Sequence, residues 1–325
     1  MMDMNTKMFA LLLIILFFFA FGCSAPVTEE PDKTSNKTNE TIKQKNETTQ
    51  PNTITKTKDN KLNTSPESTV DFDEIREEVI PSEGINLGIK WRDIGPRTVK
   101  SGALNLTKFE IIMKRNGKTL SAEQMQILQN GSNDYIIMDH NNSLFVLDVF
   151  WAFGLVSKNP VLESSPMTEN MDFIPRFAST GGWPVGNVGG GELFASKKLV
   201  TLTDAQQKIV EEVAANTYRP CCNNPTSFPD CNHGMAALGL AEWMAYQNAT
   251  KEEIYEALLA ANSYWFPQTY LETAVYFELQ NKSWNDIDPK EILSANYSSA
   301  TGYYNTKQKI KDVPQLSTIS GSCGA

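Results

Sequence analysis

Hydrophobic and polar positions after residue 71 follow the spacing of helices. Within 203–214 and 250–264, apolar residues recur every three or four positions and so share one side of a helix. Both segments begin with a hydroxyl residue followed three positions later by Glu or Gln, which is the capping-box pattern of helix starts. Three segments with this pattern are Ser121-Ala-Glu-Gln124, Thr203-Asp-Ala-Gln206 and Thr250-Lys-Glu-Glu253. Further helices are predicted over 72–80, 105–115, 143–156, 268–281 and 288–295.

The segment from Met235 to Tyr246 is apolar on nearly every side, which is typical of a helix buried all round. We predict this helix over 233–247, at the centre of the fold. Strand signals are few, and only Tyr135–Met138 and Leu193–Val200 favour a short ribbon or hairpin. The predicted fold is all-α or mainly α, with a central buried helix and at most a short β-ribbon.

A glycine-rich segment spans residues 178–192. It lacks the Gly-Lys-Ser/Thr of a phosphate-binding loop, and no strand leads from it into a Gly-x-Gly-x-x-Gly turn before a helix. We therefore expect no nucleotide cofactor and interpret the segment as a structural connector; the alternative is a mobile flap with Trp183 as its anchor.

The beginning of the chain has the pattern of an export signal. Residues 1–22 contain one lysine followed by an uninterrupted apolar run, which is shorter than the ~20 residues that a membrane-spanning helix needs. The run ends in Ala20-Phe21-Gly22-Cys23, which resembles the lipobox of bacterial and archaeal lipoproteins. This resemblance implies that Cys23 is lipidated and becomes the new N-terminus. An uncleaved membrane anchor and simple secretion are the alternatives, and all three place the body outside the cytoplasm.

Residues 23–70 are rich in Ser, Thr and Asn and contain no aromatic residue, so they predict a disordered tether. The folded body is then expected over 71–325. Four Asn-x-Ser/Thr sequons in the tether are candidate glycosylation sites of an archaeal surface stalk. The alternative is that they arise by chance, because the segment is rich in Asn, Ser and Thr. They begin at Asn36, Asn39, Asn46 and Asn63.

The formal net charge is -9, and because the leader and the tether are each neutral, the body carries all of it. Non-specific nucleic-acid binding needs a basic face, so we expect no nucleic-acid partner. The expected partner is the membrane, contacted through the lipid anchor.

The chain has one dense chemical cluster, within the site region 218–248. Cys221, Cys222, Cys231 and His233 lie within thirteen positions, although the chain has only five cysteines and two histidines. Thiolates and imidazole are the ligands that zinc and copper(I) prefer. Asp230 to His233 also leads into the predicted central helix, whose positive end favours a thiolate at Cys231.

Two other interpretations of the cluster remain open. Outside the cytoplasm cysteines usually pair, and without Cys23 an even number is left: Cys221, Cys222, Cys231 and Cys323. An interaction protein of the cell envelope, stapled by disulfides, would need no metal and no reactive thiol. A thiol-redox protein is the third interpretation. The other histidine, His140, fits a surface turn better than a ligand.

The stretch from about Leu87 to Tyr304 resembles a group of uncharacterised exported archaeal and bacterial proteins. The motifs that carry the resemblance are Tyr218-Arg-Pro-Cys-Cys222, Phe228-Pro-Asp-Cys-Asn-His-Gly-Met235 and Ser263-Tyr-Trp-Phe-Pro267.

More loosely, residues 215–266 are similar to lipoproteins with a Pro-Cys-Tyr-Cys-Gly-Cys motif, which implies metal binding. They are also similar to the helical thiol domain of cytochrome c maturation proteins. Here, however, Cys221 and Cys222 are adjacent, and neither Cys-x-x-Cys nor the haem signature Cys-x-x-Cys-His is present. Haem is therefore not expected.

Together these features predict an extracytoplasmic lipoprotein on the outer face of the membrane. Its expected function is to bind or deliver zinc or copper through Cys221, Cys222, Cys231 and His233. We do not expect an enzyme.

Overall fold

The computed structural model describes residues 70–314 and residue 316. These residues are mainly helical, which confirms the predicted fold class. The α-helices are α1 (Phe72–Val79), α2 (Ile94–Ser101), α3 (Leu106–Arg115), α4 (Ala122–Asn130), α5 (Ser143–Val156), α6 (Pro160–Glu163), α7 (Gly190–Leu193), α8 (Asp204–Asn216), α9 (Asn232–Tyr246), α10 (Lys251–Trp265), α11 (Pro267–Glu278), α12 (Pro289–Ile292), α13 (Ala295–Ser298) and α14 (Ala300–Ile310). Short 3-10 helices run over η1 (Pro166–Glu169), η2 (Met171–Arg176) and η3 (Trp284–Asp286).

Helix starts agree with the local sequence signals. Ser121, Thr203 and Thr250 are the N-caps of α4, α8 and α10, and at each helix both hydrogen bonds of the capping box are present. The predicted helix over 288–295 is shorter than expected, because α12 ends at Ile292 and a new helix starts after Ser294.

The predicted ribbon exists, but with a different partner strand. The strand β2 (Ser132–Met138) pairs antiparallel with β1 (Ile85–Arg92), which had not been predicted. Alternate side chains of β1 are buried, and these are Leu87, Ile89 and Trp91. The prediction for Leu193–Val200 is wrong: Leu193 ends α7, and the segment makes only an isolated bridge between Lys197 and Ser157.

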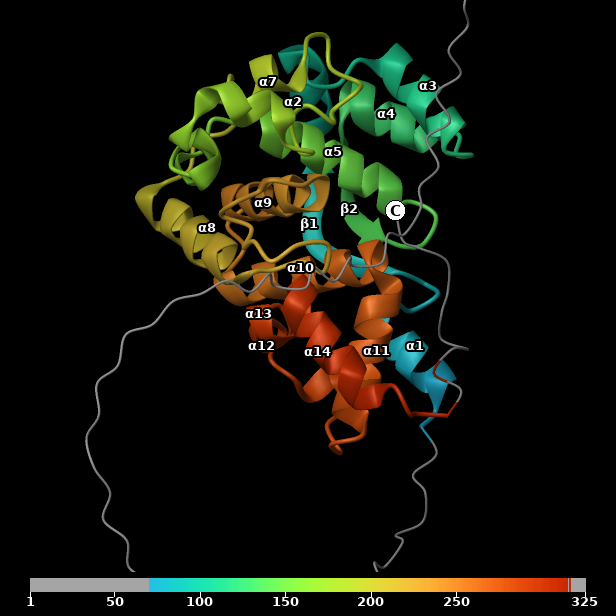
Figure 1. Ribbon diagram of the computed structural model, residues 1–325. Helices are drawn as coiled ribbons and strands as arrows, with labels where there is room; N and C mark the ends of the chain where they lie inside the picture. Colours follow the sequence, from blue (N-terminus) through green and yellow to red (C-terminus); the bar gives the residue numbers. More distant parts are fainter. Residues whose placement is uncertain (1–69, 315, 317–325) are drawn as a thin grey trace, which may run out of the picture. The chain divides into compact units, whose positions relative to one another are not determined.

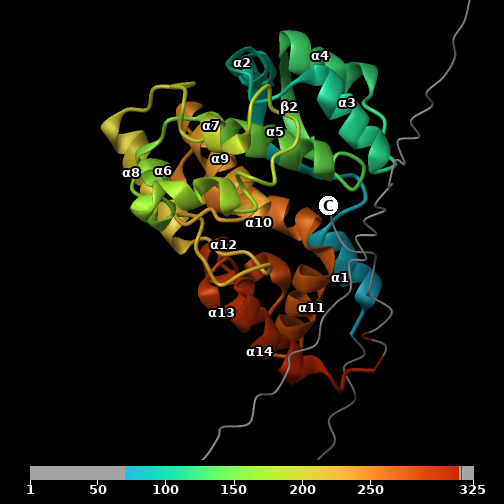
Figure 2. The same cartoon turned by 45° about the horizontal axis from the view of Figure 1, so that its top comes forward.

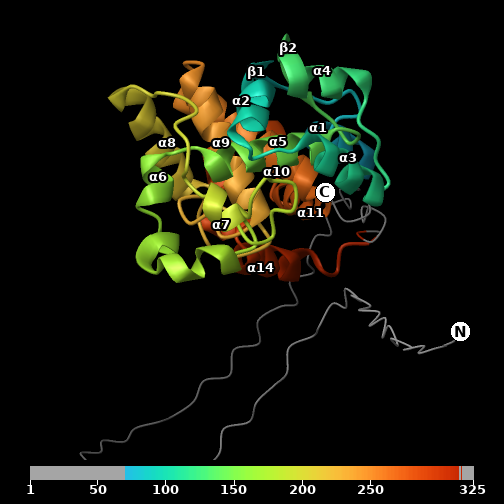
Figure 3. The same ribbon diagram turned by 90° about the horizontal axis from the view of Figure 1, so that it is seen from above.

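The helix α9 is the centre of the fold, as predicted. It lies between α5 and α10 (Figure 1), and every residue from His233 to Ala245 is buried. A Cβ at Gly239 would lie 2.4 Å from the Phe150 carbonyl oxygen, so α5 and α9 cross with their backbones in contact. Seen from above, α6 and α8 lie on one side of these central helices and α3 and α4 on the other (Figure 3).

The C-terminal helices form a second group beside α10. Helices α11, α12, α13 and α14 gather on the side of α10 away from α5 (Figure 2), and α1 packs against α11. Tyr264 and Trp265 at the end of α10 donate hydrogen bonds to the carbonyls of Pro81, in the segment after α1, and of Ser143, at the start of α5. None of the described helices is long and apolar enough to cross a membrane.

The glycine-rich segment packs against the body as a connector. Trp183 is 5% exposed, donates a hydrogen bond to the Ala103 carbonyl at 2.7 Å and packs against Trp151. A Cβ at Gly181 would lie 1.9 Å from the Pro175 carbonyl oxygen, so this turn admits only glycine.

Candidate metal centre

The cysteine loop connects α8 to α9 and is attached to the C-terminal helices by its backbone. The Tyr218 amide donates to the Leu293 carbonyl at 2.8 Å, and the Cys222 carbonyl accepts from the Ala300 amide at 2.9 Å. The Asn223 side chain accepts from the Thr301 amide at 2.9 Å. These contacts hold Cys221 and Cys222 in a defined path between α12 and α14.

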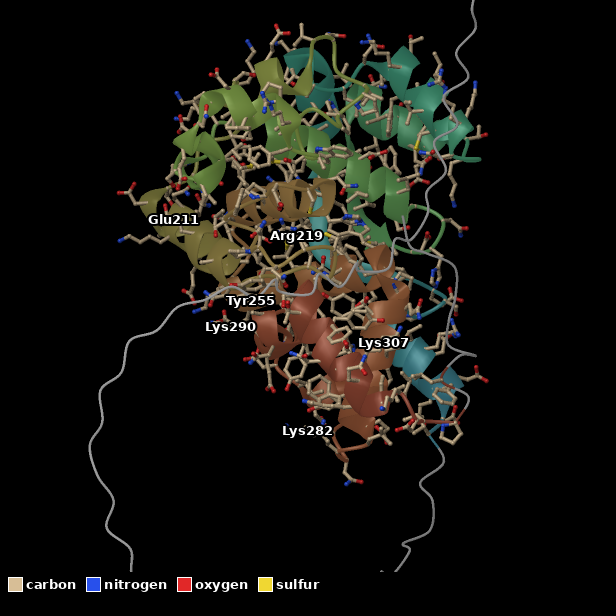
Figure 4. All side chains as sticks on the ribbon, in the orientation of Figure 1. Glu211, Arg219, Tyr255, Lys282, Lys290 and Lys307 are labelled. Carbon is tan, nitrogen blue, oxygen red and sulfur yellow. The ribbon has the colours of Figure 1, made fainter. Side chains whose placement is uncertain are left out.

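The buried Arg219 side chain hydrogen-bonds several residues of this loop. Its side chain is 1% exposed, and Figure 4 shows it in the middle of the body. The guanidinium donates to the carbonyls of Asn224 and Phe228, to an Asp230 carboxyl oxygen at 2.5 Å and to the Cys231 sulfur at 2.9 Å. A buried cation is tolerated here because its donors are satisfied and a carboxylate balances its charge.

The Cys231 side chain caps the N-terminus of α9. Its sulfur accepts from the Gly234 amide at 3.4 Å, and from Arg219 as described above. Hydrogen bonds from the Cys221 and Cys222 thiols lower the pKa of Cys231 most. The helix end and the guanidinium favour the same thiolate, so the preferred anionic sulfur of the cluster is at Cys231.

Cys221 and His233 complete a triad with Cys231. The Cys221 and Cys231 sulfurs lie 3.4 Å apart, and the ligand atoms of all three residues lie within 4.8 Å of one another. Bond lengths of about 2.0 to 2.3 Å separate the ligands of one tetrahedral zinc by roughly 3.3 to 3.8 Å, so small shifts would suffice. His233 is 8% exposed, hydrogen-bonds Cys231 and packs against the Phe266 ring at 4.3 Å.

Cys222 belongs to a second triad, with Asp230 and Cys231. Its sulfur lies 3.9 Å from the nearer Asp230 carboxyl oxygen. The predicted ligands thus form two overlapping sets that share Cys231, and the sequence analysis had not included Asp230. The described residues can hold a metal ion in either set.

Arg219 was also missed, although it stands inside the quoted motif. No spacing rule relates Arg219 to Cys231, because only the folded loop brings them together.

The described cysteines, Cys221, Cys222 and Cys231, are free thiols. Shared hydrogen bonds with Cys222 and Cys231 raise the pKa of Cys221, so it keeps its proton while Cys231 is ionised. His140 lies exposed in a turn, as predicted, and packs edge-on against Tyr264.

Several predicted residues lie outside the described part of the chain. They are Cys23, Cys323 and the sequons at Asn36, Asn39, Asn46 and Asn63. Lipidation, glycosylation and any disulfide to Cys323 stay predictions.

Comparisons with protein-family models, with curated proteins and with solved structures gave no match. The resemblances stated for the sequence motifs therefore stay predictions.

Proposed function

We propose that this protein binds a soft metal ion, zinc or copper(I), through Cys221, Cys231 and His233. The observation that supports this most is the convergence of two sulfurs and an imidazole within 4.8 Å. Two thiolates with an imidazole are a ligand set that both ions accept.

The charges around the cluster suit a cation. Arg219 and Asp230 neutralise each other, so two thiolates at Cys221 and Cys231 leave two negative charges for the ion to balance. Arg219 also orients the Cys231 sulfur, as outer hydrogen bonds do for metal ligands generally.

The exposure of the ligands favours metal exchange over a purely structural site. Cys221 is exposed while His233 is buried, so one side of the triad faces solvent. Structural zinc sites are closed by four protein ligands, whereas a site with three protein ligands leaves a position for another ligand. Metal delivery by a lipoprotein held through Cys23 at the outer face of the membrane is the role we propose.

The test is a metal titration of the reduced full-length protein in detergent under anaerobic conditions. Zn²⁺ and Cu⁺ are titrated separately against chelators of known affinity. The wild type should bind one ion, and His233→Ala should lower the affinity by roughly 100-fold or more, beyond the loss typical of residues that only orient ligands. His140→Ala, at the other histidine, is the matched control and should bind as the wild type does.

A comparison of the two cysteines separates the triads. Cys221→Ser should weaken binding more than Cys222→Ser, because only Cys221 shares a triad with His233. The proposal fails if reduced wild-type protein binds neither ion, or if the two histidine variants bind equally well.

A thiol–disulfide function is the second candidate, favoured by the 3.4 Å between the Cys221 and Cys231 sulfurs. Formation of this disulfide from the Cys221 thiol and the Cys231 thiolate would remove two electrons and one proton and would need a disulfide or quinone as the oxidant. Alkylation and mass spectrometry of the protein as isolated would show the Cys221–Cys231 crosslink. Three alkylated thiols at Cys221, Cys222 and Cys231 would exclude it.

A further inference from the structure

A buried carboxyl group lies on the central helix, away from the metal centre. Glu242 is 2% exposed and follows His233 by nine positions, which is about 14 Å along the axis of α9. The proposed metal site makes no use of it.

The Glu242 carboxyl is only partly satisfied. Its Oε1 accepts a hydrogen bond from the Ser157 hydroxyl at 2.7 Å, and its buried Oε2 accepts none of ordinary length from the described residues. A buried carboxylate oxygen without a full-strength hydrogen bond costs free energy. Burial raises the pKa of Glu242 to about 7, because it destabilises the charged carboxylate. A bound cation would stabilise this carboxylate at neutral pH.

Asn159 stands beside this carboxyl and is itself held in one orientation. Its Oδ1 accepts from the Val161 amide at 2.9 Å and from the Gln207 side chain at 3.2 Å. Its amide nitrogen is therefore the atom left to approach Glu242, whose pKa it lowers. Glu242 and Asn159 together form a fixed polar floor.

This floor belongs to a cavity of about 310 Å³ between α6, α8 and the segment that precedes α8. A volume of this size holds a small molecule. Pro160, Val200 and Leu202 form an apolar wall.

Both signs of charge stand around the cavity. Lys158, Lys198, Glu163 and Asp204 line it together with Glu242. Lys158 pairs with Glu163 at 3.4 Å, whereas Lys198 makes no ion pair with a described residue. Asp204 likewise makes no ion pair with a described residue. The cavity thus offers a buried anion at its floor, and an unpaired cation and an unpaired carboxylate among its exposed lining residues.

We propose that this cavity binds a small zwitterion of the α-amino acid class with an aliphatic side chain. The ammonium group pairs with Glu242, the carboxylate with Lys198, and the side chain contacts Val200 and Leu202. A metal cation is disfavoured, because Glu242 is the one carboxylate at the buried floor, Glu163 is paired with Lys158, and Lys198 also lines the cavity. An anion is disfavoured by Glu242.

The test measures binding of matched probes to the reduced full-length protein by calorimetry at neutral pH. L-leucine carries both charges, isoamylamine lacks the carboxylate, and N-acetyl-L-leucine lacks the ammonium group. We expect L-leucine to bind, isoamylamine to bind more weakly, and N-acetyl-L-leucine to bind at least tenfold more weakly than L-leucine.

Matched variants locate the site. Glu242→Gln keeps the size of the side chain and removes its charge, so it should fold, as circular dichroism would check, and lose L-leucine binding at least tenfold. Lys198→Gln should weaken L-leucine but not isoamylamine. Glu256→Gln, on the exposed side of α10, is the control and should bind as the wild type does.

The proposal is overturned if neither L-leucine nor isoamylamine binds the wild type at millimolar concentration. It is also overturned if folded Glu242→Gln binds L-leucine as well as Glu256→Gln does. Because no metal is needed in this experiment, its outcome is independent of the metal centre.

Discussion

Gly234→Ala is expected to damage the candidate metal centre from within the first turn of α9. A Cβ at this position would lie 2.4 Å from the Arg219 Cζ and 2.6 Å from its Nε. These distances are shorter than any stable contact between such atoms. To relieve this clash, the Arg219 guanidinium has to leave the position in which it bonds Asp230 and Cys231.

The magnitude follows from what the displacement breaks. Separating a buried ion pair costs about 3 to 5 kcal/mol in general, and this one joins Arg219 to the partly exposed Asp230 at 2.5 Å. Replacing a helical glycine by alanine returns about 1 kcal/mol of helix propensity. The free energy of unfolding should therefore fall by about 2 to 4 kcal/mol.

Urea denaturation followed by circular dichroism measures this change. Gly189→Ala is the matched control, because Gly189 has an ordinary φ of -64° and its Cβ would meet nothing closer than 3.8 Å. The control should be unchanged or slightly more stable. Gly234→Ala should also bind metal more weakly than Gly189→Ala. Equal stability and equal metal affinity of the two variants would refute the role given to Arg219.

Three further predictions concern the core, the pH dependence and the anchor. Leu238→Asp buries an unpaired charge at a position with 0% exposure and should lower the free energy of unfolding by several kcal/mol. This is a large part of an ordinary stability of ~5 to 15 kcal/mol. A thermal melt like that of the wild type would contradict the prediction. Burial raises the pKa of Asp148 from 3.8 to about 7. Between these values the native state holds a proton that the unfolded chain releases, so the free energy of unfolding falls as the pH rises from about 4 to about 7. Relative to Asp148→Asn, the wild type should lose about 1.4 kcal/mol per pH unit in that window; denaturation curves with a constant difference would exclude the effect. Cys23→Ser should release the protein from membranes in fractionation, whereas retention with an unprocessed N-terminus would indicate a plain membrane anchor.

The helices could be predicted from the sequence because their signals are local. The capping boxes at Ser121, Thr203 and Thr250 and the apolar spacing behind them involve residues within a few positions of one another. The uniformly apolar stretch from Met235 to Tyr246 likewise indicated that α9 is buried. Composition was enough for this, because a helix that is apolar all round has no side to present to water.

Strand pairing depended on the tertiary structure. The strand β2 was expected near its observed position, but its partner β1 lies 40 or more residues earlier in the chain. A two-stranded ribbon has little stability of its own, so packing on the helices decides which strands pair.

The candidate metal centre was likewise predicted in part from the sequence and decided in part by the tertiary structure. The cluster of Cys221, Cys222, Cys231 and His233 was evident from residue type and proximity alone. The sequence could not tell which sulfur joins His233, because that depends on the path of the loop across α12 and α14 and on the buried Arg219.

Glu242 had no signal in the sequence beyond being an acid within an apolar helix. The cavity in front of it is made by α6, α8 and α9, which meet only in the folded chain. Local hydrogen bonds and hydrophobic spacing determine helices, whereas a site is determined by which distant side chains are desolvated together. That second property exists only in the tertiary structure.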